Sequence, residues 1–168
     1  MFAPDNKFED ALLFSRFDRD QLLNSSSRSI YLEECEWRSA EHYVCSKIAG
    51  NSRLAEQIAA ADSAEQAALL IKPWYRLKAK GWRKSRRLFM TRALYTQVQM
   101  YDDVREYLLS TGDQLLAESS QYDHYWGVGR DWRGENMFGQ VWMDVRKKLM
   151  QDAKEQAPVP LDKDETGV

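Results

Sequence analysis

Three adjacent side chains suited to acid–base chemistry stand in the segment WRSAEHY, residues 37–43: Glu41, His42 and Tyr43. We expect this segment to open a helix, where the positive end of the helix dipole stabilises the carboxylate of Glu41. Such a carboxylate either caps free backbone N–H groups at the helix start or acts as a general base in a reaction. Composition alone leaves both roles open for Glu41.

A second carboxylate, Asp123, begins the segment DHYWGVG, in which Trp126 and Gly127 follow closely. The aspartate either caps a turn or joins Glu41 in a reaction that moves a proton or develops positive charge. A structural turn accounts for the glycines of this segment equally well.

Basic residues crowd around Trp82: Lys78, Lys80, Arg83, Lys84, Arg86, Arg87 and Arg92. Arg86 follows Trp82 by four residues, so both side chains can point to one side of a helix. A solvated helix face accounts for such a run, and a phosphate site is the alternative. Two carboxylates, a tryptophan beside an arginine and nearby basic residues together suit an anionic, aromatic ligand such as a nucleotide.

Length and charge limit the class of protein. The chain has 168 residues, enough for one domain, with 24 Lys plus Arg against 26 Asp plus Glu, a formal net charge of -2. This charge argues against a protein held on nucleic acid by global charge, without excluding a local basic patch. No apolar run approaches the roughly 20 residues that span a bilayer, and no signal peptide is recognisable. We expect a cytoplasmic protein that does not enter the membrane.

Nothing in the sequence indicates a metal or a cofactor. Two cysteines and two histidines without a CxxC pair do not make a zinc motif, and they are typical of a reducing compartment. The sequence also lacks a P-loop, a GxGxxG motif after a strand and a GxSxG motif.

The elements that position these residues are mostly helical, and the sequence predicts a mainly α domain with a small β ribbon (α+β). We expect one domain over residues 1–156 and a disordered tail over 157–168, because APVPLDKDETGV is charged and poor in apolar residues. The ribbon is predicted from Ser29–Glu33, which pairs with Glu36–Arg38 after a turn at residues 33–34.

Capping patterns predict the ends of two helices. Ser39 is expected to cap a helix that runs to about Ile48. Ser63 forms a capping box with Gln66, and Pro73 stops the helix that follows.

The second half of the chain is predicted to hold three helices. The first starts at Trp82, with one face formed by Trp82, Ser85, Phe89, Ala93, Thr96 and Met100. Asp102 or Asp103 is expected to cap the next helix, which Gly112 ends. A glycine-containing loop then leads to a last helix near Asn136, with an apolar stripe of Phe138, Val141, Trp142, Val145 and Leu149.

Taken together, these segments resemble the NADAR superfamily, the YbiA-like N-glycosidases, in an ordered series of motifs. FSRF at 14–17 resembles the family's FSNF, and residues 31–43 resemble its strand, turn and EHY signature. Residues 82–94, 108–113 and 123–129 resemble its tryptophan-led helix, LLxTGD stretch and D-x-x-WGxG loop. The start of the last helix matches at Gly134, Asn136, Gly139, Met143 and Arg146. Six motifs in order cover nearly the whole globular part.

The resemblance implies a mainly α fold, no metal, and cleavage of a bond between ribose C1 and a nitrogen. Some members hydrolyse phosphoribosylamino-pyrimidine intermediates of riboflavin synthesis, and others remove ADP-ribose from guanine in DNA or nucleotides. By the same resemblance, Glu41 and Asp123 are the catalytic carboxylates. The implied substrate-binding residues are Trp82 for the base, Arg86 for the phosphate, and also His42, Tyr43, Trp126, Gly127 and Asn136. The paired N–H donors of Arg16 make it a further candidate for holding the phosphate.

The chain departs from the family pattern in three places. Arg16 replaces the asparagine of FSNF, which exchanges a neutral amide for a charged fork. The family often has a lysine seven residues after the EHY glutamate, in some members forming a Schiff base, but this chain has Ile48 there and Lys47 one residue earlier. Lys47 then lies about 120° from Glu41 around a regular helix, which puts a covalent route in doubt. Trp132 adds bulk to the loop, so the pocket rim is expected to be specific to this chain.

The sequence thus predicts a hydrolase that cleaves a small-molecule phosphoribosyl substrate and releases ribose 5-phosphate. The alternative enzyme is an ADP-ribosyl-guanine glycohydrolase, acting on ADP-ribosylated nucleic acid or nucleotides, which would need a second phosphate and adenosine pocket. A non-catalytic nucleotide or ADP-ribose binding module is disfavoured by the presence of both Glu41 and Asp123. Binding of unmodified nucleic acid through residues 78–92 is a further alternative.

Overall fold

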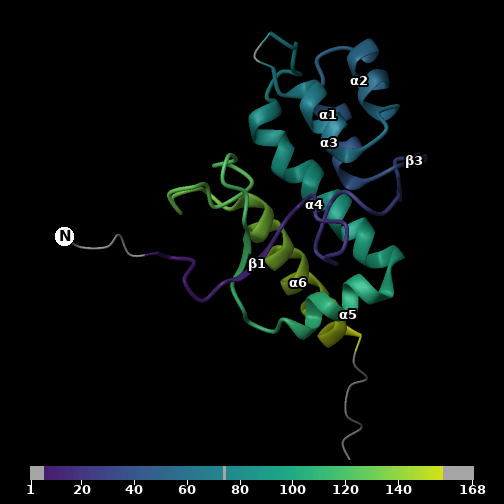
Figure 1. Ribbon diagram of the computed structural model, residues 1–168. Helices are drawn as coiled ribbons and strands as arrows, with labels where there is room; N and C mark the ends of the chain where they lie inside the picture. The colour runs from purple at the N-terminus through teal and green to yellow at the C-terminus, as the bar shows by residue number, and fades with distance from the viewer. Residues whose placement is uncertain (1–5, 74, 157–168) are drawn as a thin grey trace, which may run out of the picture.

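The computed structural model describes residues 6–73 and 75–156 (Figure 1). Within this part the elements follow in the order β1 (Leu12–Phe14), β2 (Ile30–Leu32), β3 (Cys35–Trp37), α1 (Ala40–Ile48), α2 (Ser52–Ala59), α3 (Ala64–Ile71), α4 (Trp82–Met100), α5 (Asp102–Ser110), β4 (Leu116–Glu118) and α6 (Met137–Glu155). The mainly α class with a small β ribbon is confirmed. The tail expected at 157–168 lies outside the described residues.

The predicted ribbon is the antiparallel pair of β2 and β3, in which Tyr31 faces Glu36. Its turn places Glu33 and Glu34 at positive φ, 55° and 62°. Residues other than glycine rarely adopt this backbone conformation, so contacts with other elements must stabilise the turn. Those contacts come from α1 and α4 and are described below.

A second pair of strands was not predicted from the sequence. β1 and β4 pair in parallel, with Phe14 opposite Glu118. Three residues are too few for an alternating pattern to stand out. Because the carboxyl ends of parallel strands meet at one edge, this pair brings the segment after Phe14 next to the segment after Glu118. The helix α2, capped by Asn51, was also missed.

Most predicted helix ends are confirmed. Ser39 caps α1 by accepting a hydrogen bond from the backbone N–H of His42. Ser63 caps α3 in the same way, although the returning bond of the capping box reaches Gln66 from the backbone N–H of Asp62. The prediction for α5 is wrong by one residue, because Tyr101 is the N-cap and no side chain caps the helix.

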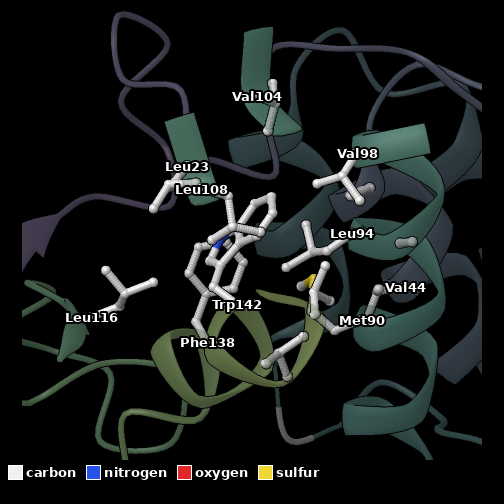
Figure 2. Packing of buried hydrophobic residues seen from close by; sticks show 14 of the residues in the cluster. Leu23, Val44, Met90, Leu94, Val98, Val104, Leu108, Leu116, Phe138 and Trp142 are labelled. Atoms are coloured by element: carbon white, nitrogen blue, oxygen red, sulfur yellow. The ribbon is translucent and has the colours of Figure 1, made fainter. Parts of the chain in front are cut away.

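The principal core lies between α4 and α6 (Figure 2), with α5 packed beside both. The stripe predicted on α6 is confirmed, since its residues are all buried. The face predicted for α4 is correct only in part, because Ala93 is buried and Trp82 and Phe89 pack against apolar clusters, but Ser85, Thr96 and Met100 do not belong to them. The buried residues of α4 are Met90, Ala93, Leu94, Gln97 and Val98. The helix packs against both α1 and α6, so its buried face is set by two neighbours, and Met100 at its end is exposed.

The helices α1, α2 and α3 gather at one end of α4, whereas α5 lies at the other end (Figure 1). Their own apolar cluster consists of Cys45, Ile48, Leu54, Ile58, Ala67 and Ile71, with Trp82 and Phe89 packed against it. The long helix α4 therefore packs against both clusters of apolar side chains, and it contacts α1, the helix that carries Glu41.

Candidate active site

A cavity of about 610 Å³ lies where α1, α3, the start of α4 and the 119–136 loop meet. The segment after β1 completes its wall. Its charged lining includes seven side chains: Arg16, Glu41, Glu65, Lys72, Lys78, Arg86 and Asp123. The two carboxylates singled out in the sequence therefore line one cavity, together with Trp82 and Trp126.

Glu41 is almost completely buried, with 3% of its surface exposed. It stands in the first turn of α1, directly after the N-cap Ser39 and Ala40. Its Oε2 accepts a hydrogen bond from the hydroxyl of Ser25 at 2.8 Å, and its backbone N–H donates to the carbonyl of Ser25 at 3.0 Å. Its Oε1 has only longer contacts, to Arg16 Nη1 at 3.9 Å and Cys45 Sγ at 3.8 Å. One oxygen of this carboxylate is thus fixed and the other retains capacity to accept.

Arg16 lies between the two carboxylates. Its Nη2 donates to Asp123 Oδ2 at 3.2 Å, while its Nη1 lies 3.9 Å from Glu41 Oε1. Burial works against the charge of this guanidinium, but Glu41, Asp123 and Glu118 outweigh it and raise the pKa of Arg16. Arg16 therefore stays charged and offsets part of the negative charge around it.

Asp123 has both a turn-forming contact and an exposed part. Its Oδ1 accepts from the backbone N–H groups of Tyr125 and Trp126, at 3.0 and 2.8 Å. Its side chain is 28% exposed, and its Oδ2 is the oxygen that meets Arg16. Asp123 therefore both caps its turn and lines the cavity.

An aromatic and basic group lies on another side of the cavity. The guanidinium of Arg86 lies over the rings of Trp82 and Tyr125, 5.0 and 3.0 Å from their centroids. Lys78 Nζ lies 5.6 Å from the Trp82 ring. The backbone of Lys78 pairs with that of Ala49 at the far end of α1, and Ala49 lies about 12 Å along the helix axis from Glu41. Glu41 and the backbone of Lys78 therefore lie at opposite ends of α1.

Three of the predicted site residues on α1 do not line the cavity. His42 is held between Ser39 Oγ, 2.7 Å from Nδ1, and the carbonyl of Ala61, 3.1 Å from Nε2. Tyr43 donates its hydroxyl to Glu33 at 3.0 Å, and burial together with this bond raises its pKa to about 12. Lys47 forms an ion pair with Glu33.

Three residues of the loop also lie outside the lining. Asn136 bonds the backbone of β4, accepting from the N–H of Glu118 and donating to the carbonyl of Leu116, both at 2.9 Å. A side chain at Gly127 would collide with the Glu118 carboxylate, so a glycine is needed there. Trp132, expected at the rim, is 37% exposed and does not contribute to the lining.

Sequence reasoning missed Glu118, Ser25 and Cys45. Glu118 is 2% exposed and accepts from the backbone N–H groups of Arg16 and Ser120, at 3.2 and 3.1 Å. Burial raises the pKa of Glu118, although Arg16 opposes this. Burial and, after it, the charge of Glu41 raise the pKa of the Cys45 thiol well above its ordinary value, which disfavours the thiolate. Cys45 follows Glu41 by four residues, a spacing that could have revealed their contact.

The described residues contain no group of three or more His, Cys, Asp or Glu side chains placed to hold a metal ion. Among the helices in the described ranges, none is long and apolar enough to cross a membrane.

Comparisons with known proteins identify relatives of this chain. An N-glycosidase of Nostoc punctiforme is 33% identical over 129 residues, which cover 75% of this chain and 83% of that protein. A riboflavin biosynthesis protein of Vibrio vulnificus is 30% identical over 150 residues, covering 88% of this chain but 41% of that protein. The NMR structure of E. coli YbiA has the same fold, with a TM-score of 0.77 at 22% identity, over 96% of this chain and 100% of the other. The NADAR domain model matches residues 2–150, so this chain belongs to the NADAR domain family.

Proposed function

We propose that this chain is an N-glycosidase that hydrolyses the ribosyl C–N bond of phosphoribosylamino-pyrimidine intermediates of riboflavin biosynthesis. The observation that carries the proposal is the meeting of Glu41 and Asp123, from distant segments, around one guanidinium in the wall of a cavity. The names of the Nostoc punctiforme and Vibrio vulnificus relatives support the reaction and the pathway.

The proposed reaction is attack of water on ribose C1. The C1–N bond breaks, its electron pair stays on the nitrogen, and the nitrogen takes up a proton. The products are ribose 5-phosphate and the free aminopyrimidine. Positive charge develops on the ribose ring in the transition state. Glu41 is buried and has one oxygen with only long contacts, so it suits stabilising this charge or accepting the proton of the water.

The other lining residues suit the rest of the substrate. Trp82 offers a flat ring for the pyrimidine. Arg86 and Lys78 carry the positive charge that a phosphate requires, and Arg86 supplies donors in a planar fork. Asp123 is partly exposed and can orient the water or a sugar hydroxyl.

Cleavage of ADP-ribosylated guanine is the second candidate, because the cavity extends to α3. That extension adds Glu65, Ala68, Leu69, Ile71 and Lys72 to the lining. A lysine beside apolar side chains suits the second phosphate and the adenosine of a larger ligand. The two substrates therefore belong in one experiment.

The test is a paired turnover measurement on the full chain, its Glu41→Gln variant and Glu56→Gln, an exposed glutamate of α2. One reaction contains the phosphoribosylamino-pyrimidine, with ribose 5-phosphate followed by mass spectrometry. The other contains ADP-ribosylated guanosine, with ADP-ribose followed. We expect turnover of the first substrate, reduced at least about a hundredfold by Glu41→Gln and unchanged by Glu56→Gln.

Turnover of ADP-ribosylated guanosine alone would move the assignment to the second candidate. A folded wild-type chain that is silent in both reactions would favour a binding module. Equal rates for the wild type and Glu41→Gln would rule out the role given to Glu41.

A further inference from the structure

Arg16 is an arginine that is 6% exposed and lies between the two carboxylates of the cavity. We propose that Arg16 is a positioning residue that holds Glu41 and Asp123 in register and reduces their repulsion of an anionic ligand. It is not itself the phosphate clamp. This inference rests on the proposed function, since it concerns the same site and the same phosphorylated substrate.

The geometry places the guanidinium against both carboxylates at once. Asp123 Oδ2 lies 3.2 Å from Nη2, within hydrogen-bond distance, and Glu41 Oε1 lies 3.9 Å from Nη1. Each carboxylate is fixed elsewhere by its other oxygen, Glu41 by Ser25 and Asp123 by the backbone of its loop. Among the described residues, the Arg16 guanidinium is therefore the group that forms ion pairs with both α1, at Glu41, and the 119–136 loop, at Asp123.

Arg16 is itself held from several sides. Its backbone N–H donates to Glu118 Oε1 at 3.2 Å, and its carbonyl accepts from the N–H of Ser25 at 3.1 Å. Its guanidinium carbon lies 4.6 Å from the ring centroid of Phe17 and 5.6 Å from that of Trp126. The parallel pairing of β1 with β4 brings Arg16 to Glu118. A guanidinium fixed in this way keeps the carboxylates of Glu41 and Asp123 at a defined separation.

The guanidinium of Arg16 does not use all of its hydrogen-bond donors. Nε and Nη1 are buried and have no hydrogen-bond partner among the described residues. An arginine with a purely structural role would be expected to have its buried donors satisfied. The ion pair with Glu41 is instead longer than a hydrogen bond, which leaves Glu41 Oε1 with free capacity for the reaction.

The charges explain why an arginine rather than a neutral donor suits this position. Glu41 and Asp123 carry -2 when ionised, and Arg16 reduces the sum to -1. The site then still favours positive charge on the ribose, while the phosphate of the substrate meets less repulsion. Binding the phosphate directly falls to Lys78 and Arg86, neither of which forms an ion pair with Glu41 or Asp123 in the part of the chain that the structure describes.

Two variants separate the geometric effect from the charge effect. Arg16→Lys keeps the charge but loses the planar fork, and we expect kcat to fall by about a hundredfold because the carboxylates lose their register. Arg16→Asn loses both. We expect the same fall in kcat and, in addition, a KM for the phosphorylated substrate raised at least about tenfold more than the KM for its dephosphorylated form.

The matched control is Arg28→Asn. Arg28 also pairs with an aspartate, Asp103, and also lies over an aromatic ring, that of Tyr101, but it does not line the cavity. Its kinetic constants should equal those of the wild type. Melting temperatures of all variants are measured beside the kinetics.

A purely structural role for Arg16 would lower the melting temperature while leaving kcat and the ratio of the two KM values unchanged, and this result overturns the proposal. If Arg16→Asn does not fold, Arg16→Lys decides, because a wild-type kcat in that variant overturns it equally. Failure of the proposed function looks different, since the wild type itself would then not turn over the substrate.

Discussion

His42 is a buried imidazole whose two ring nitrogens both have partners inside the protein. Nδ1 meets Ser39 Oγ and Nε2 meets the carbonyl of Ala61, so the ring ties the start of α1 to the end of α2. We expect His42→Ala to lower the free energy of unfolding by about 2 kcal/mol, because two buried partners lose their bonds and a cavity remains. The KM of the folded fraction should not change, because the ring lies outside the cavity lining.

The same residue makes stability depend on pH. Burial lowers the pKa of His42 in the folded protein. Below about pH 6.5 the unfolded chain binds a proton that the folded chain does not, so stability falls as the pH falls through this window. Urea unfolding at pH 7.5 and pH 5.5 should therefore show a smaller pH effect in His42→Ala than in the wild type. A raised KM without a loss of stability would instead place His42 at the ligand.

The types of the candidate catalytic residues were readable from the sequence, but the direction of neighbouring side chains was not. Glu41 and Asp123 stand in recognisable motifs and both line the cavity. His42 and Tyr43 share the EHY motif with Glu41, yet on a helix consecutive residues point in different directions. Which of them faces the cavity depends on what packs against α1. Glu118 carried no motif and is explained only by the pairing of β1 with β4.

At the scale of elements, the turn between β2 and β3 is secured by Glu33. Its carboxylate pairs with Lys47 of α1 and with Arg92 of α4, and accepts from the hydroxyl of Tyr43. Its side chain is 29% exposed, so solvent weakens these contacts. We expect Glu33→Gln to lower the free energy of unfolding at pH 7 by about 1 kcal/mol, because the variant loses the ion pairs and the turn keeps its positive φ.

The contribution of Glu33 to stability should decrease as the pH falls. The hydrogen bond from Lys47 is the largest cause that lowers the pKa of Glu33 in the folded protein. The stabilisation is present above the ordinary glutamate pKa of about 4.3 and is lost as the pH falls through the lowered value. The difference in the free energy of unfolding between the wild type and Glu33→Gln should therefore disappear at acidic pH. Glu34→Gln, on the same turn, serves as the control, and an equal loss in both variants would contradict the prediction.

The predictability of the elements followed their length and their local chemistry. The caps at Ser39 and Ser63 and the ribbon turn at Glu33 are local patterns, and the structure has them where the sequence indicated. β1 and β4 depend on each other across about a hundred residues of chain, and no local pattern carries that pairing. The buried face of α4 was misjudged because two neighbouring helices, not one, cover it.

At the scale of the whole molecule, Trp142 of α6 lies in the principal core. It does not line the cavity. Trp142 is fully buried, 6.2 Å from Phe138 between ring centroids, and it lies near Leu94 and Met90 of α4 and Leu108 of α5 (Figure 2). The core sets the position of α4, and α4 delivers Trp82 and Arg86 to the cavity. Because Trp142 does not line the cavity, a change there should act on the site through the packing and stability of α4 and not through contact with the ligand.

The indole N–H of Trp142 is buried without a hydrogen-bond partner among the described residues. Trp142→Ala should lower the free energy of unfolding by about 3–5 kcal/mol, because a large cavity remains. Trp142→Phe removes the unpaired N–H as well as some packing, so the two effects oppose each other and the loss should stay near about 1 kcal/mol. Urea unfolding of both variants measures the difference, with Trp132→Phe as the partly exposed control. Equal losses in Trp142→Phe and Trp142→Ala would mean that the indole N–H has a partner, for example a buried water, whose bond both substitutions remove.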